Sequence, residues 1–141
     1  MAGQSLDVRE GQELPVLTKA VTQEKVSLYA TASRDFNPIH IDEEFARKTA
    51  LGGRVAHGML ILAYVSEVMT AAFGQAWITS GKLDVRFKAA ARPGETIKVS
   101  GQVVKVEKNE AQTSVRCSVL CSNDKGEAII TGEASLTISA G

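Results

Sequence analysis

An acidic side chain and an imidazole stand five positions apart in this chain, at Asp35 and His40. The Asn37-Pro38 step between them restricts the backbone, because proline disfavours helical geometry in the residue before it. Histidine exchanges protons near neutral pH, and a positioned carboxylate can act with it as acid or base. The pair suits proton transfer to and from a carbon atom next to a polarised carbonyl group. We expect Asp35 and His40 to be the catalytic residues.

A polarised carbonyl group needs hydrogen-bond donors, and a second stretch offers them. Val55-Ala56-His57-Gly58-Met59 opens an apolar helix, and a helix N-terminus presents unpaired N–H groups with partial positive charge. Gly58 would let a substrate oxygen approach these amides closely, or it would only permit tight packing of the helix against a sheet. We expect Gly58 to bind the substrate. For His57 we favour a helix-cap residue or a hydrogen-bonded core histidine over a catalytic role.

Two polar residues of the first stretch also have purely structural interpretations. An aspartate before a turn often accepts hydrogen bonds from neighbouring backbone amides, but the company of His40 favours a functional role for Asp35. Asn37 is expected mainly to shape the loop, because asparagine side chains bond to local backbone groups. It can also position a water molecule, so we place Asn37 with Gly58 among the substrate-binding residues.

The run Ser33-Arg34-Asp35-Phe36-Asn37-Pro38-Ile39-His40 closely resembles the hydratase motif of the MaoC-like (R)-specific enoyl-CoA hydratases and dehydratases. The resemblance implies a hot-dog fold, in which an antiparallel β-sheet wraps around a long central α-helix. It implies that two such domains pair edge to edge, so we expect a homodimer. It also implies that amides at the helix start, with Gly58 as the matching position, bind the carbonyl oxygen of a thioester.

The same resemblance implies reversible hydration of trans-2-enoyl-CoA to (R)-3-hydroxyacyl-CoA. No metal or other cofactor is expected, since coenzyme A enters as part of the substrate. Which of Asp35 and His40 is the base stays open, because two close titrating groups share their apparent pKa values. One alternative is a 3-hydroxyacyl-thioester dehydratase of fatty-acid or polyketide elongation that acts on carrier-protein substrates. Another is a non-catalytic hot-dog subunit, and a thioesterase is disfavoured because the motif belongs to the hydratase branch.

The motif departs from the family pattern at Arg34, where glycine is usual. If that glycine serves a backbone with positive φ, arginine would be strained by about 1–2 kcal/mol, and the loop would have to shift to an ordinary conformation. If the glycine only leaves room, Arg34 can keep the loop geometry and place its guanidinium near the site or against Glu43 or Glu44. We favour the second explanation, because the rest of the motif is retained.

The elements that must position these residues follow from hydrophobic periodicity. A helix is predicted over about 57–73; it is apolar nearly all round and therefore expected to be buried on most sides. Thr22 and Asp42 are predicted to cap two earlier helices. Alternation with period two predicts strands, with a β-bulge near Val103 where the apolar phase slips; they are expected at about 14–21, 83–87, 97–106, 115–121 and 128–138. This is an α+β pattern, expected to form a single domain over residues 1–141.

Charge and hydropathy exclude several classes of partner. Sixteen Lys and Arg residues balance sixteen Asp and Glu residues, which argues against nucleic-acid and anionic-membrane partners. The longest apolar run, Met59 to Val65, falls short of the roughly 20 residues that a membrane span needs. The first residues lack the basic and then apolar pattern of a signal peptide. We expect a cytoplasmic protein.

The two cysteines are not expected to react or to bind a metal ion. In a strand Cys117 and Cys121 would lie about 13 Å apart, at roughly 3.3 Å per residue, which is too far for a disulfide. Their alternation with polar residues makes both of them small buried hydrophobes. With only two histidines and no cluster of cysteine or histidine, no metal site is predicted.

Overall fold

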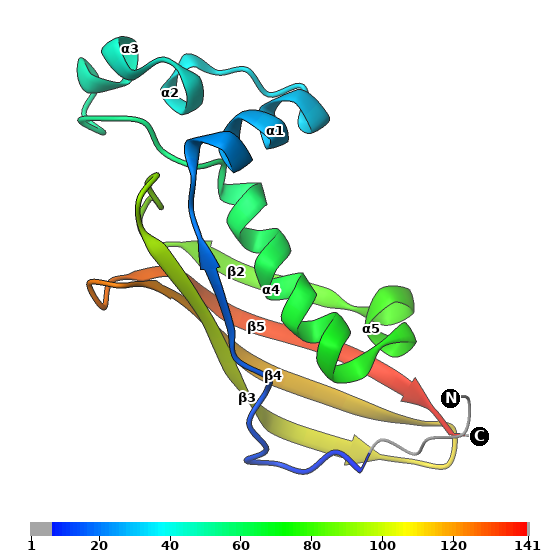
Figure 1. Cartoon of the computed structure of the whole chain (residues 1–141). Helices are drawn as coiled ribbons and strands as arrows, with labels where there is room; N and C mark the ends of the chain where they lie inside the picture. Colours follow the sequence, from blue (N-terminus) through cyan, green and yellow to red (C-terminus); the bar gives the residue numbers. More distant parts are fainter. Residues whose placement is uncertain (1–6, 141) are drawn as a thin grey trace.

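Five strands form one antiparallel sheet, and a long helix lies across one face of it (Figure 1). The structure is a computed structural model that describes residues 7–140. The strands are ordered β1-β3-β4-β5-β2 across the sheet, and each neighbouring pair is antiparallel. Their bounds are β1 Leu17–Ala20, β2 Lys82–Phe87, β3 Thr96–Lys108, β4 Gln112–Asn123 and β5 Ala128–Ser139. The α+β architecture expected from the sequence is confirmed.

The long helix, α4, spans Gly58–Phe73 and supplies the middle of the core. Its buried side chains recur at helical spacing and belong to one cluster with the inward-facing residues of the strands: Ile61, Val65, Val68, Met69 and Phe73. Another stripe of the helix is exposed, at Met59, Ala63, Glu67 and Ala71. The expectation that this helix is buried on most sides is therefore wrong for a single chain, because the sheet covers only one of its faces.

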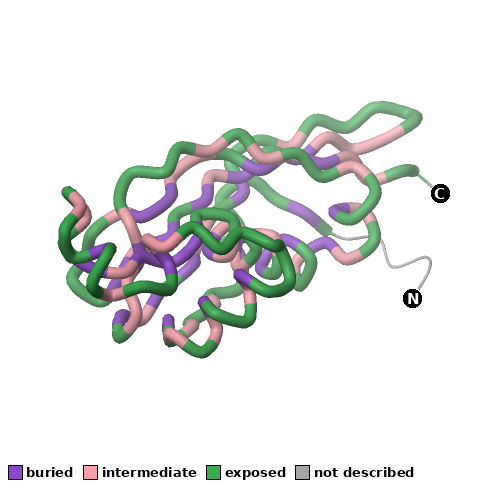
Figure 2. The backbone as a smooth tube through the Cα atoms, turned by 90° about the horizontal axis from the view of Figure 1, so that it is seen from above, coloured by how far each residue is buried: buried purple, intermediate pink, exposed green. Residues whose placement is uncertain are grey.

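The central strands alternate as the sequence predicts. In β4, Cys117 and Cys121 are buried between the sheet and α4, and both are free thiols. Burial raises the pKa of Cys117 to about 11 and that of Cys121 to about 12. The register between β3 and β4 shifts between Val103 and Lys105, which confirms the predicted β-bulge. Figure 2 shows the buried segments gathered in the interior and the exposed ones along the outer edges and loops.

Short helices gather beyond the two ends of α4. Three of them lie next to its N-terminus (Figure 1), namely α1 (Gln23–Ser33), α2 (Pro38–Ile41) and α3 (Glu43–Arg47), and α5 (Gln75–Ser80) follows its C-terminus. The predicted caps are confirmed: the Thr22 side chain accepts a hydrogen bond from the Lys25 amide at 3.1 Å, and Asp42 accepts one from the Phe45 amide at 3.0 Å. Helices α2 and α5 were not predicted, because four and six residues are too few to show a helical period.

Within residues 7–140, no helix has the length and apolar character needed to cross a membrane. The longest one, α4, has 16 residues, against about 20 for a membrane span.

Candidate active site

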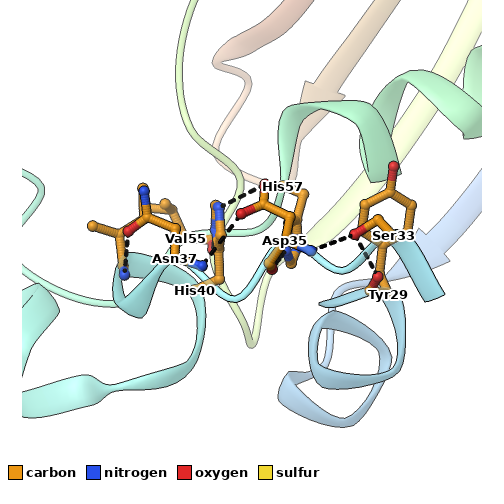
Figure 3. Close-up of polar contacts among 8 residues, drawn as sticks. Tyr29, Ser33, Asp35, Asn37, His40, Val55 and His57 are labelled. Carbon is orange, nitrogen blue, oxygen red and sulfur yellow. Dashed lines mark hydrogen bonds and ion pairs between the residues drawn. The ribbon is translucent and has the colours of Figure 1, made fainter. Parts of the chain in front are cut away.

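Asp35 and His40 lie together at the end of the molecule where α4 begins (Figure 3). Asp35 follows α1, and His40 is in the short helix α2 that Pro38 begins. The distance from Asp35 Oδ2 to His40 Nε2 is 3.9 Å. His40 is only 7% exposed, whereas the Asp35 side chain is 54% exposed. The structure therefore brings the two expected catalytic residues together and leaves the carboxylate open to a ligand or water.

The backbone carbonyl of Val55 determines which nitrogen of His40 carries hydrogen. His40 Nδ1 lies 2.7 Å from the Val55 oxygen, and a carbonyl can only accept, so Nδ1 is the donor. In the neutral ring, Nε2 then has a free lone pair, and this is the atom that faces Asp35. The Val55 amide in turn donates to the Ile39 carbonyl at 3.1 Å, which holds the two segments in register. His40 can therefore accept a proton at Nε2.

The two carboxylate oxygens of Asp35 make different contacts. Oδ1 accepts a hydrogen bond from the Asn37 amide at 3.2 Å, which is the structural role expected of an aspartate before a turn. Oδ2 is the atom nearest His40. Asn37 uses its own side-chain oxygen to cap α2, accepting from the Ile39 amide at 3.2 Å. These bonds support the loop-shaping role of Asn37, while its contact with substrate stays a prediction.

His57 is the hydrogen-bonded core histidine that was one of its two expected roles, and it lies directly beside the pair. It occupies the N-cap position of α4 without making a side-chain cap, and it is 3% exposed. Its ring stacks on that of His40, with centroids 3.8 Å apart and planes 24° apart. Its Nε2 lies 3.0 Å from the backbone oxygen of Asp35. The sequence contains one indication that His57 lies near His40, since the two histidines of the chain fall in the two stretches that carry the motifs.

A cavity of about 360 Å³ lies beside the pair. Most of its lining is apolar, and it includes His40, Gly58, Ile61, Phe87, Ala91 and Ile129. Neither Asp35 nor Asn37 lines it. An apolar chain can therefore occupy the cavity and bring a reacting carbon to the edge where His40 Nε2 and the carboxylate meet.

Gly58 lies in close packing and also faces the cavity, while its binding of substrate stays a prediction. A Cβ on Gly58 would lie 3.0 Å from Cε1 of Phe87, so the glycine lets α4 pack closely against the end of β2. Gly58 is also exposed and lines the cavity. The first N–H groups of a helix have no carbonyl within that helix to bond. A carbonyl oxygen in the cavity can therefore accept hydrogen bonds from the start of α4.

The backbone conformation of Arg34 agrees with neither explanation in full. It is the C-cap of α1, with φ 62° and ψ 25° in the left-handed region, so the position does require positive φ and does more than leave room. The backbone has nevertheless not adopted the ordinary conformation expected of a shifted loop, and Asp35 Oδ2 lies 3.9 Å from His40 Nε2. Among the ion pairs of the described residues, Glu43 pairs with Arg54 and Glu44 with Lys48, and neither pairs with Arg34. Arg34 therefore has a strained left-handed backbone, and Asp35 and His40 nevertheless lie close together.

The expectation that no histidine cluster exists is also wrong. One ligand atom each from Asp35, His40 and His57 lies within 4.8 Å of the others. Zinc ligands converge on one point at about 2.0–2.1 Å, whereas nearly parallel rings direct their in-plane lone pairs side by side. The stacked rings therefore fit a metal ion poorly, and the absence of a metal from the site stays a prediction.

Comparison with known proteins identifies the family. The family model described as MaoC like domain matches residues 7–124. A curated (R)-specific enoyl-CoA hydratase from Rhodospirillum rubrum is 30% identical over 136 residues, covering 95% of this chain and 90% of the relative. A mitochondrial 3-hydroxyacyl-[acyl-carrier-protein] dehydratase from Arabidopsis thaliana is 30% identical over 119 residues, covering 84% and 70%.

Similarity of structure leads to the same fold. The (R)-hydratase from A. caviae matches with a TM-score of 0.80 at 24% identity, covering 93% of this chain and 97% of that one. The antiparallel sheet against α4 is therefore a hot-dog fold. With a family model that spans most of the chain, this chain belongs to the MaoC-like family of hydratases and dehydratases that act on acyl thioesters.

Proposed function

We propose that this protein catalyses the reversible hydration of trans-2-enoyl-CoA to (R)-3-hydroxyacyl-CoA. The observation that carries the proposal is the separation of 3.9 Å between Asp35 Oδ2 and His40 Nε2 at the edge of an apolar cavity. This distance is too long for a direct hydrogen bond, but one water molecule can bond both atoms at about 2.8 Å each. The (R) configuration and the coenzyme A thioester follow the name of the Rhodospirillum rubrum relative.

In hydration, the water molecule between Asp35 and His40 is the nucleophile. Its oxygen bonds to the β-carbon while one of its protons passes to the pair, and His40 Nε2 has the free lone pair to accept it. The π bond between the α- and β-carbons breaks, and the pair delivers one proton to the α-carbon. One water is added in total, and the pair returns to its starting protonation state. Dehydration uses the same groups in reverse order.

The start of α4 stabilises the charge that develops during this addition. When the β-carbon is attacked, negative charge accumulates on the thioester oxygen. Hydrogen-bond donors fixed in advance at such an oxygen usually contribute a large part of the rate enhancement. We expect the amides near Gly58 to supply these donors, because Gly58 is exposed and lines the cavity.

The carrier-protein alternative has its own support. The Arabidopsis relative is named for an acyl-carrier-protein substrate, and its identity to this chain equals that of the hydratase. Both substrates present the same enoyl thioester to the cavity. They differ only beyond the pantetheine arm, so the pair and the helix start serve either one. The presence of both Asp35 and His40 argues against a non-catalytic subunit.

The surroundings of the site support a homodimer. Three large apolar side chains around it are exposed, with Phe36 at 54%, Met59 at 59% and Phe87 at 53%. Strand β2 ends the sheet and pairs only with β5 among the described strands. A second copy against this edge would cover both the strand and the apolar side chains. The cytoplasmic location stays a prediction from the sequence.

The experiment is a kinetic comparison of matched thioesters. Purified protein is given crotonyl-CoA and the crotonyl thioester of an acyl carrier protein, and loss of the conjugated enoyl absorbance is followed. We expect faster turnover of the CoA thioester. Turnover should fall by about 10²- to 10⁴-fold in Asp35→Asn and be retained in Glu44→Gln, which removes an exposed carboxylate outside the site. Preference for the carrier-protein thioester would select the alternative. No turnover of either would contradict the proposed function.

A further inference from the structure

His57 lies between two other rings at the start of α4. On one side the His40 ring stacks on it at 3.8 Å, and on the other the Tyr29 ring lies at 4.8 Å with planes tilted by 57°. Tyr29 belongs to α1, His40 to α2, and His57 is the residue before α4. The three rings therefore join three helices at one point, and His40 cannot move toward His57 without displacing this column.

The same side chain also holds the backbone of Asp35. His57 Nε2 is 3.0 Å from the Asp35 carbonyl oxygen, so Nε2 carries the hydrogen and donates it. His57 Nδ1 is buried and has no hydrogen-bond partner among the described residues. One face of His57 thus contacts the imidazole of the pair, and its N–H group fixes the main chain that carries the carboxylate.

We propose that His57 is a positioning residue that sets the geometry between Asp35 and His40. This role rests on the proposed function, because it matters only if the pair transfers protons. His57 keeps the His40 ring in the plane where Nδ1 donates to Val55 and Nε2 points at Asp35. It also prevents the Asp35 main chain from moving away, so that the 3.9 Å separation is preserved. A shift of about 1 Å in such a pair can reduce turnover by about 10²-fold.

Three substitutions separate the two contacts. His57→Phe keeps an aromatic face against His40 and loses the N–H donor. His57→Gln keeps an amide donor near the position of Nε2 and loses the ring. His57→Leu loses both. We expect kcat to fall by about 10-fold in each of the first two variants and by about 10²-fold in the third, with KM changed less than threefold, because the cavity lining is untouched.

A control variant shows whether lower stability by itself reduces kcat. Val68 is buried in the same helix away from the site, so Val68→Ala weakens the core without touching the pair. At a temperature where every variant is folded by circular dichroism, we expect Val68→Ala to keep the wild-type kcat. If His57→Leu fails to fold, His57→Phe and His57→Gln still decide the matter. Wild-type kcat in both of them would overturn the positioning role.

A spectroscopic measurement tests His57 without any activity assay. The chain has only two histidines, so long-range ¹H–¹⁵N correlation of tag-free protein resolves each ring, and every His57 variant leaves His40 alone in the spectrum. We expect the wild type to show His40 with hydrogen on Nδ1 and His57 with hydrogen on Nε2. In His57→Leu we expect His40 to become a mixture of tautomers.

The two measurements distinguish failure of this inference from failure of the proposed function. An unchanged His40 tautomer in His57→Leu, with wild-type turnover, would overturn the positioning role and leave the hydratase proposal intact. A protein that hydrates no thioester, but loses the single His40 tautomer in His57→Leu, would overturn the proposed function while the geometric effect of His57 persists.

Discussion

Asp35 Oδ2 and His40 Nε2 face each other across 3.9 Å, each held from behind by a backbone contact. The Asn37 amide bonds to the other oxygen of the carboxylate, and the Val55 carbonyl accepts from the other nitrogen of the ring. The two facing atoms are therefore fixed in position and have no hydrogen-bond partner among residues 7–140, an arrangement suited to holding one water molecule.

Removing either member of this pair should cost most of the activity. We expect Asp35→Asn and His40→Ala each to lower kcat by about 10²- to 10⁴-fold, the usual contribution of a general acid or base. The double variant should be scarcely slower than the worse single variant, since the residues act as a unit. Steady-state kinetics with crotonyl-CoA checks this, and near wild-type turnover in either single variant would rule out the site.

Gly58→Ala tests the close packing of α4 on Phe87. The new Cβ would lie 3.0 Å from the Phe87 ring, so either the ring or the helix start has to move, and we expect kcat to fall by at least tenfold. The double variant Gly58→Ala with Phe87→Ala relieves the contact. Recovery of kcat in the double variant would mean that packing caused the loss. No recovery, with the protein folded, would place the loss at the amides.

Arg34→Gly should make the protein more stable. The left-handed backbone at Arg34 costs about 1–2 kcal/mol for an L-residue, and glycine removes this cost. Glycine also gives the unfolded chain more conformational freedom, which lowers the stability by about 0.4–1 kcal/mol. We expect a net gain of about 1 kcal/mol in the free energy of unfolding, with activity retained. Arg34→Ala is the matched control, since it loses the guanidinium but keeps the strain. Equal stability of the two variants would contradict the strain argument.

The two thiols should make the fold sensitive to alkaline pH. Burial raises the pKa of Cys117 to about 11 and of Cys121 to about 12, from 9.0. Above about pH 9 the unfolded chain releases these protons while the folded protein keeps them, so the free energy of unfolding falls as pH rises. Denaturant titrations at pH 8 and 10 measure this. Replacing both cysteines by alanine should flatten the dependence, and an equally steep decline in that variant would assign it to other groups.

The homodimer is tested by measuring the mass in solution and by substituting the exposed Phe87. Light scattering is expected to give about twice the 15.0 kDa of one chain. Phe87→Asp should shift the protein toward the monomer, because a charge would be buried where the second copy packs. Ile78→Asp, on an apolar residue of α5 that is 65% exposed, is the control and should leave the mass unchanged. A monomer that turns over substrate would contradict the prediction.

Local sequence patterns predicted the helices and strands but not the contacts between residues that are distant in the sequence. The apolar run after Gly58 and the alternation around Cys117 are features of neighbouring residues, so α4, the strands and the bulge at Val103 follow from the sequence. His57 meets His40 only because helices α1, α2 and α4 converge, and no spacing between residues 40 and 57 predicts a ring stack. The backbone of Arg34 likewise depends on how α1 ends and on where Asp35 has to lie.

The lining of the cavity comes from different parts of the chain. One part contains His40 and Gly58; another is formed by residues 87–91 and Ile129, and it includes neither Asp35 nor His40. The Lys88 amide donates to the Ile129 carbonyl at 2.8 Å and so joins the segments of this second part. On the proposed function, we therefore expect that exchanging the connection after β2 changes which acyl group is accepted, while Asp35 and His40 keep their sequence and positions.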